Sequence, residues 1–106
     1  MDEQRMKGLM GLSVRAGQAV FGEEGCLKTL REGKAALLLI DNSISENARS
    51  KYESLGKRMN VPVIILRTGM LEESTGRPGR AMAVRPGGLA EQMSHCLEAS
   101  GQQVDA

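Results

Sequence analysis

The chain has 106 residues and a formal net charge of +1, and 41% of its residues are hydrophobic and 25% charged. These values are typical of a globular protein and exclude a disordered tail, a collagen and a coiled coil. The longest apolar run, at 35–40, has the length of a strand, and the acidic N-terminus does not resemble a secretory signal. We therefore expect a cytoplasmic protein with no membrane association.

The length predicts one domain over residues 1–100, followed by a frayed polar tail over 101–106. Cys26 and Cys96 are far apart and His95 is the one histidine, which disfavours a zinc site. The chain has neither a Walker A nor a GxGxxG pattern, and no Ser/His/Asp or Cys/His grouping can be recognised. We expect no metal, no small-molecule cofactor and no enzymatic activity.

The first half of the chain alternates between helical and extended patterns. Apolar residues at helical spacing predict a first helix that Gly17 ends, and 18–21 reads as a short strand. A helix is predicted over 23–32 because two acids occupy its first turn and Gly33 follows it. The run at 35–40 is apolar at every position, which predicts a strand covered on both faces, as in a parallel sheet.

The second half continues this alternation. Ser43 and Glu46 form a capping box that predicts the start of a long helix reaching Met59. Strands are expected over 61–66 and 81–84, with a short helix over 70–74 between them. The inner stripe of a closing helix consists of Leu89, Met93, Cys96 and Leu97.

The resulting α-β-α-β-α-β-α-β-α order predicts an α/β fold. We expect a three-layer α-β-α sandwich around a four-stranded, mostly parallel mixed sheet, with about five helices. The crossover from 35–40 to 61–66 should be right-handed.

A ligand site is expected where parallel strands end, since the loops that enter the following helices collect at that edge. The three such loops are 22–25, 41–45 and 67–70. Each leads to a helix N-terminus, whose unpaired N–H groups and positive dipole favour phosphate. Arg77 and Arg80 lie in an acid-free, glycine-rich stretch that predicts a mobile basic loop.

Many short segments, in this order and spacing, resemble the bacterial YlxQ-type proteins of the L-seven-Ae family of kink-turn-binding ribosomal proteins. The resemblance runs from about Met6 to Leu97 and implies a non-catalytic protein that docks on structured RNA through the same loop edge. The RNA would be a ribosomal, ribonuclease P or regulatory RNA, and the partners would include ribosome or ribonucleoprotein components. The segments are Leu9-Met-Gly-Leu12, Arg15-Ala-Gly17, Gly22-Glu-Glu24, Leu27-Lys28, Gly33-Lys34-Ala35, Leu38-Leu39-Ile40, Asp41, Ser45-Glu46-Asn47 and Val61-Pro62-Val63.

The sequence departs from this family at two positions. Kink-turn binders carry Gly-x-Asn-Glu-x-x-Lys at the start of the second helix, where Asn and Glu read sheared G·A pairs. Gly22 and Lys28 match the ends of this pattern, but Glu24 replaces the Asn and Gly25 replaces the Glu. A carboxylate only accepts hydrogen bonds and glycine has no side chain, so the resemblance implies RNA binding without strict kink-turn specificity.

Two functions remain open from the sequence. The first is RNA binding, and the alternative is a protein-interaction adaptor on the same scaffold with little or no RNA binding, which the near-neutral charge favours. A salt-dependent affinity for RNA separates them, because phosphate contacts weaken with salt. The candidate RNA-binding residues are Gly22, Glu23, Glu24, Gly25, Lys28, Arg31, Asp41, Asn42, Ser43, Arg67, Thr68, Gly69, Arg77 and Arg80.

Overall fold

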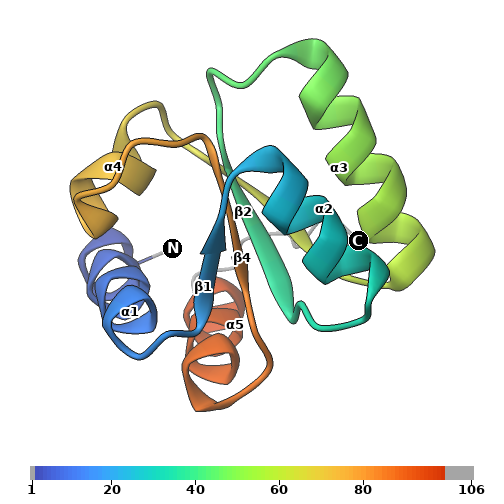
Figure 1. Ribbon diagram of the computed structural model, residues 1–106. Coiled ribbons are helices and arrows are strands. Elements are labelled where there is room, and N and C mark those ends of the chain that lie inside the picture. Colours follow the sequence, from blue (N-terminus) through green and yellow to red (C-terminus); the bar gives the residue numbers. More distant parts are fainter. Residues whose placement is uncertain (1, 100–106) are drawn as a thin grey trace.

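A computed structural model describes the chain over residues 2–99, with backbone alone at 98 and 99 (Figure 1). The tail predicted at 101–106 lies outside this range. None of the helices in the described range is both long and apolar enough to span a membrane. The elements are α1 (Glu3–Arg15), β1 (Ala19–Phe21), α2 (Glu23–Arg31), β2 (Leu37–Asp41), α3 (Glu46–Met59), β3 (Val63–Leu66), α4 (Met70–Thr75), β4 (Ala81–Val84) and α5 (Gly88–Ala99).

The predicted three-layer sandwich is confirmed. Figure 1 shows α1, α4 and α5 on one face of the sheet and α2 with α3 on the other. The alternating residues of β2 separate the two cores: Leu37 and Leu39 pack beneath the first group of helices, and Leu38 and Ile40 beneath the second. Every residue of β2 is buried, as its unbroken apolar sequence predicts.

The sheet is mostly antiparallel, so the prediction of a mostly parallel sheet is wrong. Its strand order is β1-β4-β2-β3, and only β2 and β3 pair in parallel. β4 lies between β1 and β2 and runs antiparallel to both. β1, β2 and β3 consequently point in the same direction, and β4 alone is reversed.

The reversal of β4 follows from the short connection that precedes it. A parallel strand requires the chain to return across the whole sheet, usually through a long helix. α4 has only six residues and packs against α1 beside the sheet edge instead. The chain therefore enters β4 at the edge where β3 ended, and Asp41 N–H at the end of β2 donates to the carbonyl of Arg80 at 2.8 Å.

α3 begins two residues later than the capping box predicts. Ser45 is its N-cap, with the hydroxyl accepting from Ala48 N–H at 3.2 Å. Ser43 is not a cap, because its backbone N–H and its hydroxyl both donate to the carboxylate of Asp41, at 2.8 and 2.6 Å. This local turn, formed by an aspartate with the residue two positions later, competes with capping.

Gly56 lets α3 pack tightly against β3. A Cβ atom at this position would lie 2.6 Å from Cγ2 of Val63 and 3.0 Å from the carbonyl oxygen of Val61. We expect Gly56→Ala to lower the free energy of unfolding by about 1–3 kcal/mol, because overpacking outweighs the better helix propensity of alanine. Urea unfolding measures this change.

Gly8 in α1 provides the matched control. A Cβ atom there meets nothing within 4 Å, so Gly8→Ala should raise the free energy of unfolding by about 0.5–1 kcal/mol through helix propensity alone. Equal effects of the two substitutions would contradict the close approach of α3 and β3.

Candidate functional site

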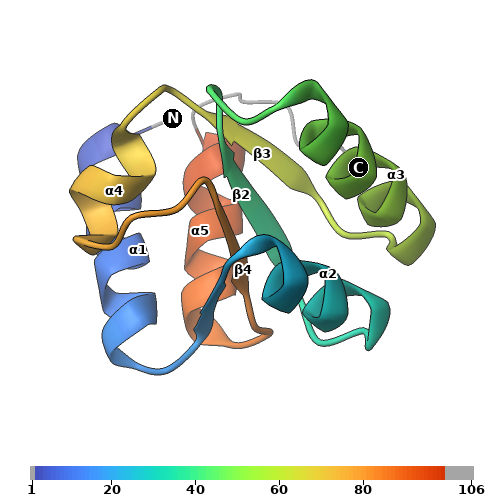
Figure 2. The same cartoon turned by 45° about the horizontal axis from the view of Figure 1, so that its top comes forward.

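One edge of the sheet gathers the loops that the sequence marks as a site. Because β1, β2 and β3 run in one direction, the segments after them leave the sheet at the same edge, and the segment before β4 enters there. The segments at this edge, which we call the loop edge, are 22–25, 41–45, 67–69 and 76–80. Figure 2 shows these connections with the top of Figure 1, where the loop edge lies, turned toward the viewer.

The N-terminus of α2 lies at the loop edge without a side-chain cap. Gly22 is the N-cap, and its φ of 86° is in the left-handed region that favours glycine. Glu23 and Glu24 are exposed in the first turn. The first N–H groups of α2 therefore have no side-chain acceptor from the N-cap and can bind an external one.

Gly25 is a packing position. A Cβ atom there would lie 3.1 Å from Cγ1 of Val20, so α2 approaches β1 closely at this point. A glutamate at position 25, as in kink-turn binders, would have to displace the Val20 side chain. The absence of a side chain at Gly25 thus has a structural reason in this chain.

Asp41 connects three segments of the loop edge. One carboxylate oxygen accepts from the N–H and hydroxyl of Ser43, and the other accepts from Gly69 N–H at 2.9 Å. Its own N–H donates to the carbonyl of Arg80, and the N–H of Asn42 donates to Leu66 at 2.9 Å. Asp41 is buried, so its role is to position these loops.

The ionised form of Asp41 is favoured in the fold. Burial of the carboxylate acts to raise its pKa, but the hydrogen bonds from Ser43 and Gly69 and the charge of Arg80 outweigh this effect. The pKa of Asp41 therefore lies below its ordinary value. Asn42 and Ser43 stay exposed beside it.

The segment 76–80, which contains Arg77 and Arg80 and which we call the arginine loop, packs against the end of β1. The guanidinium of Arg77 lies 4.4 Å from the centroid of the Phe21 ring, in cation–π geometry. A Cβ atom at Gly79 would lie 3.6 Å from the same ring, where the φ of 145° favours glycine. Because Phe21 directly precedes Gly22, this contact brings Arg77 next to the start of α2.

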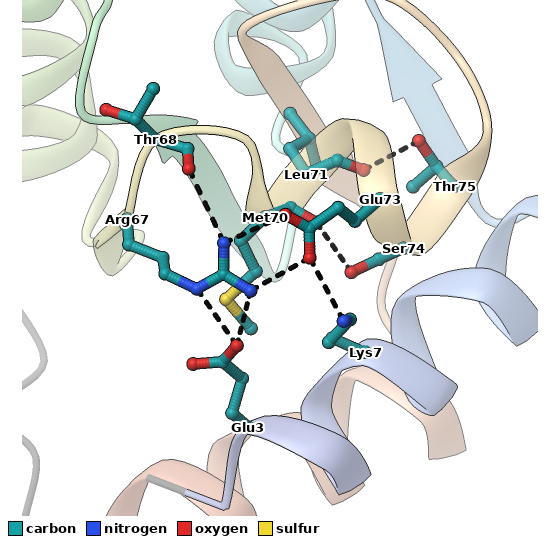
Figure 3. A network of polar contacts seen from close by, with 9 residues as sticks. All are labelled: Glu3, Lys7, Arg67, Thr68, Met70, Leu71, Glu73, Ser74 and Thr75. Carbon is teal, nitrogen blue, oxygen red and sulfur yellow. Dashed lines mark hydrogen bonds and ion pairs between the residues drawn. The ribbon is translucent and has the colours of Figure 1, made fainter.

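Arg67 is directed into an ion-pair network instead (Figure 3). Its guanidinium donates from Nε to Glu3 at 2.9 Å and from Nη1 and Nη2 to Glu73 at 3.0 and 2.9 Å. Lys7 also pairs with Glu73 at 3.1 Å. The network joins the loop after β3 to α1 and α4, and two carboxylates offset the charge of Arg67. Thr68 is exposed, and Gly69 is the N-cap of α4.

The network shifts the protonation of its members. Hydrogen bonds from Arg67 and then Lys7 lower the pKa of Glu73 to about 2. The hydrogen bond from Arg67 likewise lowers the pKa of Glu3, while the two glutamates raise the pKa of Arg67. The positive charge of Arg67 is thus offset by its ion pairs with Glu3 and Glu73.

Lys28 and Arg31 lie further along α2 and line two different grooves, and Gly25 of the loop edge also lines the groove of Lys28. Lys28 lines a groove beside β1 together with Glu32, Lys34 and Arg85. Arg31 lines a separate groove between α2 and α3, with Lys51 and Arg58 from α3 among its neighbours. The structure therefore divides the predicted site into the loop edge and two grooves that flank α2.

The sequence did not predict Phe21, Lys51 or Arg58 as residues of the functional site. The spacing of Lys51 and Arg58 by seven residues places both on one side of α3 and could have indicated a shared surface. The contact of Phe21 with Arg77 joins residues more than fifty positions apart, and the sequence contains no signal for it.

Cys26 belongs to the buried core between the sheet and the layer of α2 and α3. Burial raises the pKa of the Cys26 thiol to about 11, which fits a packing role, and His95 is exposed. Among the side chains that the structure describes, at 2–97, no group of three or more His, Cys, Asp or Glu is arranged to hold a metal ion.

Comparison with known proteins identifies the family of this chain. The Ribosomal protein L7Ae/L30e/S12e/Gadd45 family matches residues 4–87, which is most of the chain. The chain belongs to this family. The resemblance predicted from the sequence is thereby confirmed.

One curated relative is similar to this chain in sequence, and two solved structures share its fold. The chain is 26% identical over 98 residues to the RNA-binding protein YlxQ of Enterococcus faecium, covering 92% of this chain and 95% of that protein. It superimposes on a protein of unknown function from Bacillus halodurans C with a TM-score of 0.82, 22% identity and coverage of 89% and 97%. A 15.5kD RNA binding protein of Giardia lamblia gives a TM-score of 0.74, 14% identity and coverage of 93% and 90%.

Substitution of Asp41 tests its positioning role. Asp41→Asn replaces one acceptor oxygen with a donor, which must face an N–H or O–H group of Ser43 or Gly69. We expect the free energy of unfolding at pH 7 to fall by about 1–3 kcal/mol. The loss should be full above the ordinary aspartate pKa and shrink as the pH falls through the lowered folded value.

Asp2, the exposed N-cap of α1, is the matched control for this experiment. Asp2→Asn should change the unfolding free energy by only a few tenths of a kcal/mol, since asparagine is an equally good N-cap. Similar losses from both substitutions in urea unfolding would show that Asp41 does not hold the loops.

The Arg67 network predicts a specific acid response. Because the pKa of Glu73 is depressed in the fold, its contribution to stability is present above about pH 4.5 and is lost as the pH falls toward 2. Glu73→Gln should therefore flatten the decrease of Tm between pH 5 and 2. Glu72→Gln, at an exposed neighbour outside the network of Figure 3, should keep the wild-type pH profile. Parallel profiles of the wild type and Glu73→Gln would contradict the ion pairs.

Proposed function

We propose that this protein binds structured RNA through the loop edge and catalyses no reaction. The observation that carries the proposal is the meeting of the uncapped start of α2 with the arginine loop, through the contact of Arg77 with Phe21. The names of the Enterococcus faecium and Giardia lamblia proteins, both described as RNA-binding, support it.

The chemistry of the loop edge suits an RNA backbone with accessible bases. N–H groups at a helix N-terminus and two exposed guanidinium groups, Arg77 and Arg80, attract phosphate. Glu23 and Glu24 are acceptors for the amino groups of bases, which loops and bulges expose. Arg67, whose charge two glutamates offset, contributes to the shape of the edge more than to phosphate binding.

Strict kink-turn recognition is not part of the proposal. The pattern needs an amide donor and a carboxylate where this chain has Glu24 and Gly25. A side chain at Gly25 would also require the Val20 side chain to shift by a few tenths of an ångström. The RNA therefore carries exposed bases of another arrangement, in a ribosomal, ribonuclease P or regulatory RNA. Ribosome or ribonucleoprotein components as partners and a cytoplasmic location stay predictions.

A gel-shift titration of sheared total cellular RNA at several salt concentrations tests the proposal. The wild type should bind with an affinity that falls steeply with salt. Arg77→Ala combined with Arg80→Ala should lower the affinity for all RNAs and reduce the slope of log affinity against log salt by about 1.5, because each phosphate contact contributes roughly 0.7–0.9.

The control removes the same charge elsewhere. Arg5 and Arg15 are exposed on α1, on the far side of the sheet from α2. Arg5→Ala combined with Arg15→Ala should leave the slope nearly unchanged. An equal slope change in both double variants would show a net-charge effect and no docking at the loop edge. Absence of RNA binding by the wild type would favour the protein-interaction adaptor.

A further inference from the structure

The groove between α2 and α3, which we call the α2–α3 groove, is lined by cations and by no acidic side chain. It has a volume of about 230 Å³ and is formed by Leu27, Arg31, Lys51, Ser54, Leu55 and Arg58. The two helices lie side by side in Figures 1 and 2. The two leucines, one buried and one half-buried, form its apolar part, while the three cations are exposed.

The cations of the α2–α3 groove are available to an external anion. No ion pair among the described side chains, at 2–97, involves Arg31 or Arg58. Lys51 pairs with Glu23 at 3.3 Å, but both side chains are about half exposed or more, and such surface pairs are weak. Two guanidinium forks facing a small groove with a serine hydroxyl are suited to a phosphate group.

The volume of the α2–α3 groove argues against a ligand much larger than a phosphate group. Sites for small molecules begin at roughly 300 Å³ and are mostly apolar, and this groove is smaller and rimmed by charge. The groove beside β1 is less suited to an anion, because Glu32 lines it and lies 3.6 Å from Lys34.

The α2–α3 groove is continuous with the loop edge. Glu23, in the first turn of α2, pairs with Lys51 in the groove wall, so the two surfaces meet at the start of α2. Arg31 lies eight residues further along the helix, which is about 12 Å. One RNA strand can therefore contact both the loop edge and the groove.

We infer that the α2–α3 groove binds a backbone phosphate of the same RNA that the loop edge holds, with Arg31 and Arg58 as its contacts. This inference rests on the proposed function and extends it. The RNA footprint then runs from the loop edge along the outer face of α2 toward its C-terminus, and it includes α3, which sequence analysis left out of the site.

Salt-dependent gel shifts with sheared total RNA test the inference through three double variants. Arg31→Ala with Arg58→Ala should weaken binding threefold or more and lower the salt slope by about 1.5, as two lost phosphate contacts require. Arg31→Lys with Arg58→Lys keeps the charge and should retain most of the slope. Arg5→Ala with Arg15→Ala is the charge-matched control, and thermal unfolding checks that every variant folds.

The outcomes separate the inference from the proposed function. If the alanine variant of the groove matches the α1 control while the variant of Arg77 and Arg80 loses affinity, the groove does not contact RNA and the loop edge alone does. If a charge-keeping lysine variant loses as much slope as the alanine variant, the groove effect is structural and the inference fails. If the wild type does not bind RNA, both proposals fail together.

Discussion

Asp41 ends β2 at the place where two other segments of the loop edge must be held, and its carboxylate is the contact on which the geometry of the loop edge depends. It receives the N–H of Gly69 from the next loop and both donors of Ser43. Its backbone N–H reaches Arg80 at the start of β4. A buried acceptor with this many donors cannot move without leaving hydrogen bonds unmade, so β2, β3 and β4 present their loops in one fixed arrangement.

The elements around Asp41 show which features the sequence predicts and which it does not. The unbroken apolar run of β2 was sufficient to predict a sheet covered on both faces, because burial is a local property of each position. The direction of β4 was not predictable from alternation, since it depends on how far six-residue α4 carries the chain. Ser45 and not Ser43 is the N-cap because the donors of Ser43 bind the carboxylate of Asp41. The sequence pattern of a capping box does not show this competing contact.

The candidate site divides for a related reason. Sequence position identified the loops correctly as neighbours, because strand direction fixes the edge at which they lie. It could not show which charges remain available. Arg67 and Arg77 look alike in sequence, but the first faces Glu3 and Glu73 whereas the second faces an aromatic ring that leaves its charge uncompensated. Only the fold distinguishes a structural arginine from one that can bind phosphate.

This distinction explains how a chain with a net charge of only +1 can offer the proposed RNA-binding surface. Carboxylates offset cations around α1 and α4, where Glu73 takes two positive partners. The outer side of α2 and α3 keeps Arg31 and Arg58 without such partners among the described residues. A local excess of positive charge over a few ångströms determines phosphate attraction, because salt screens more distant charges beyond a Debye length of about 8–10 Å. The distribution of the charges over the two helical layers, and not their sum, therefore determines which face of this domain can meet RNA.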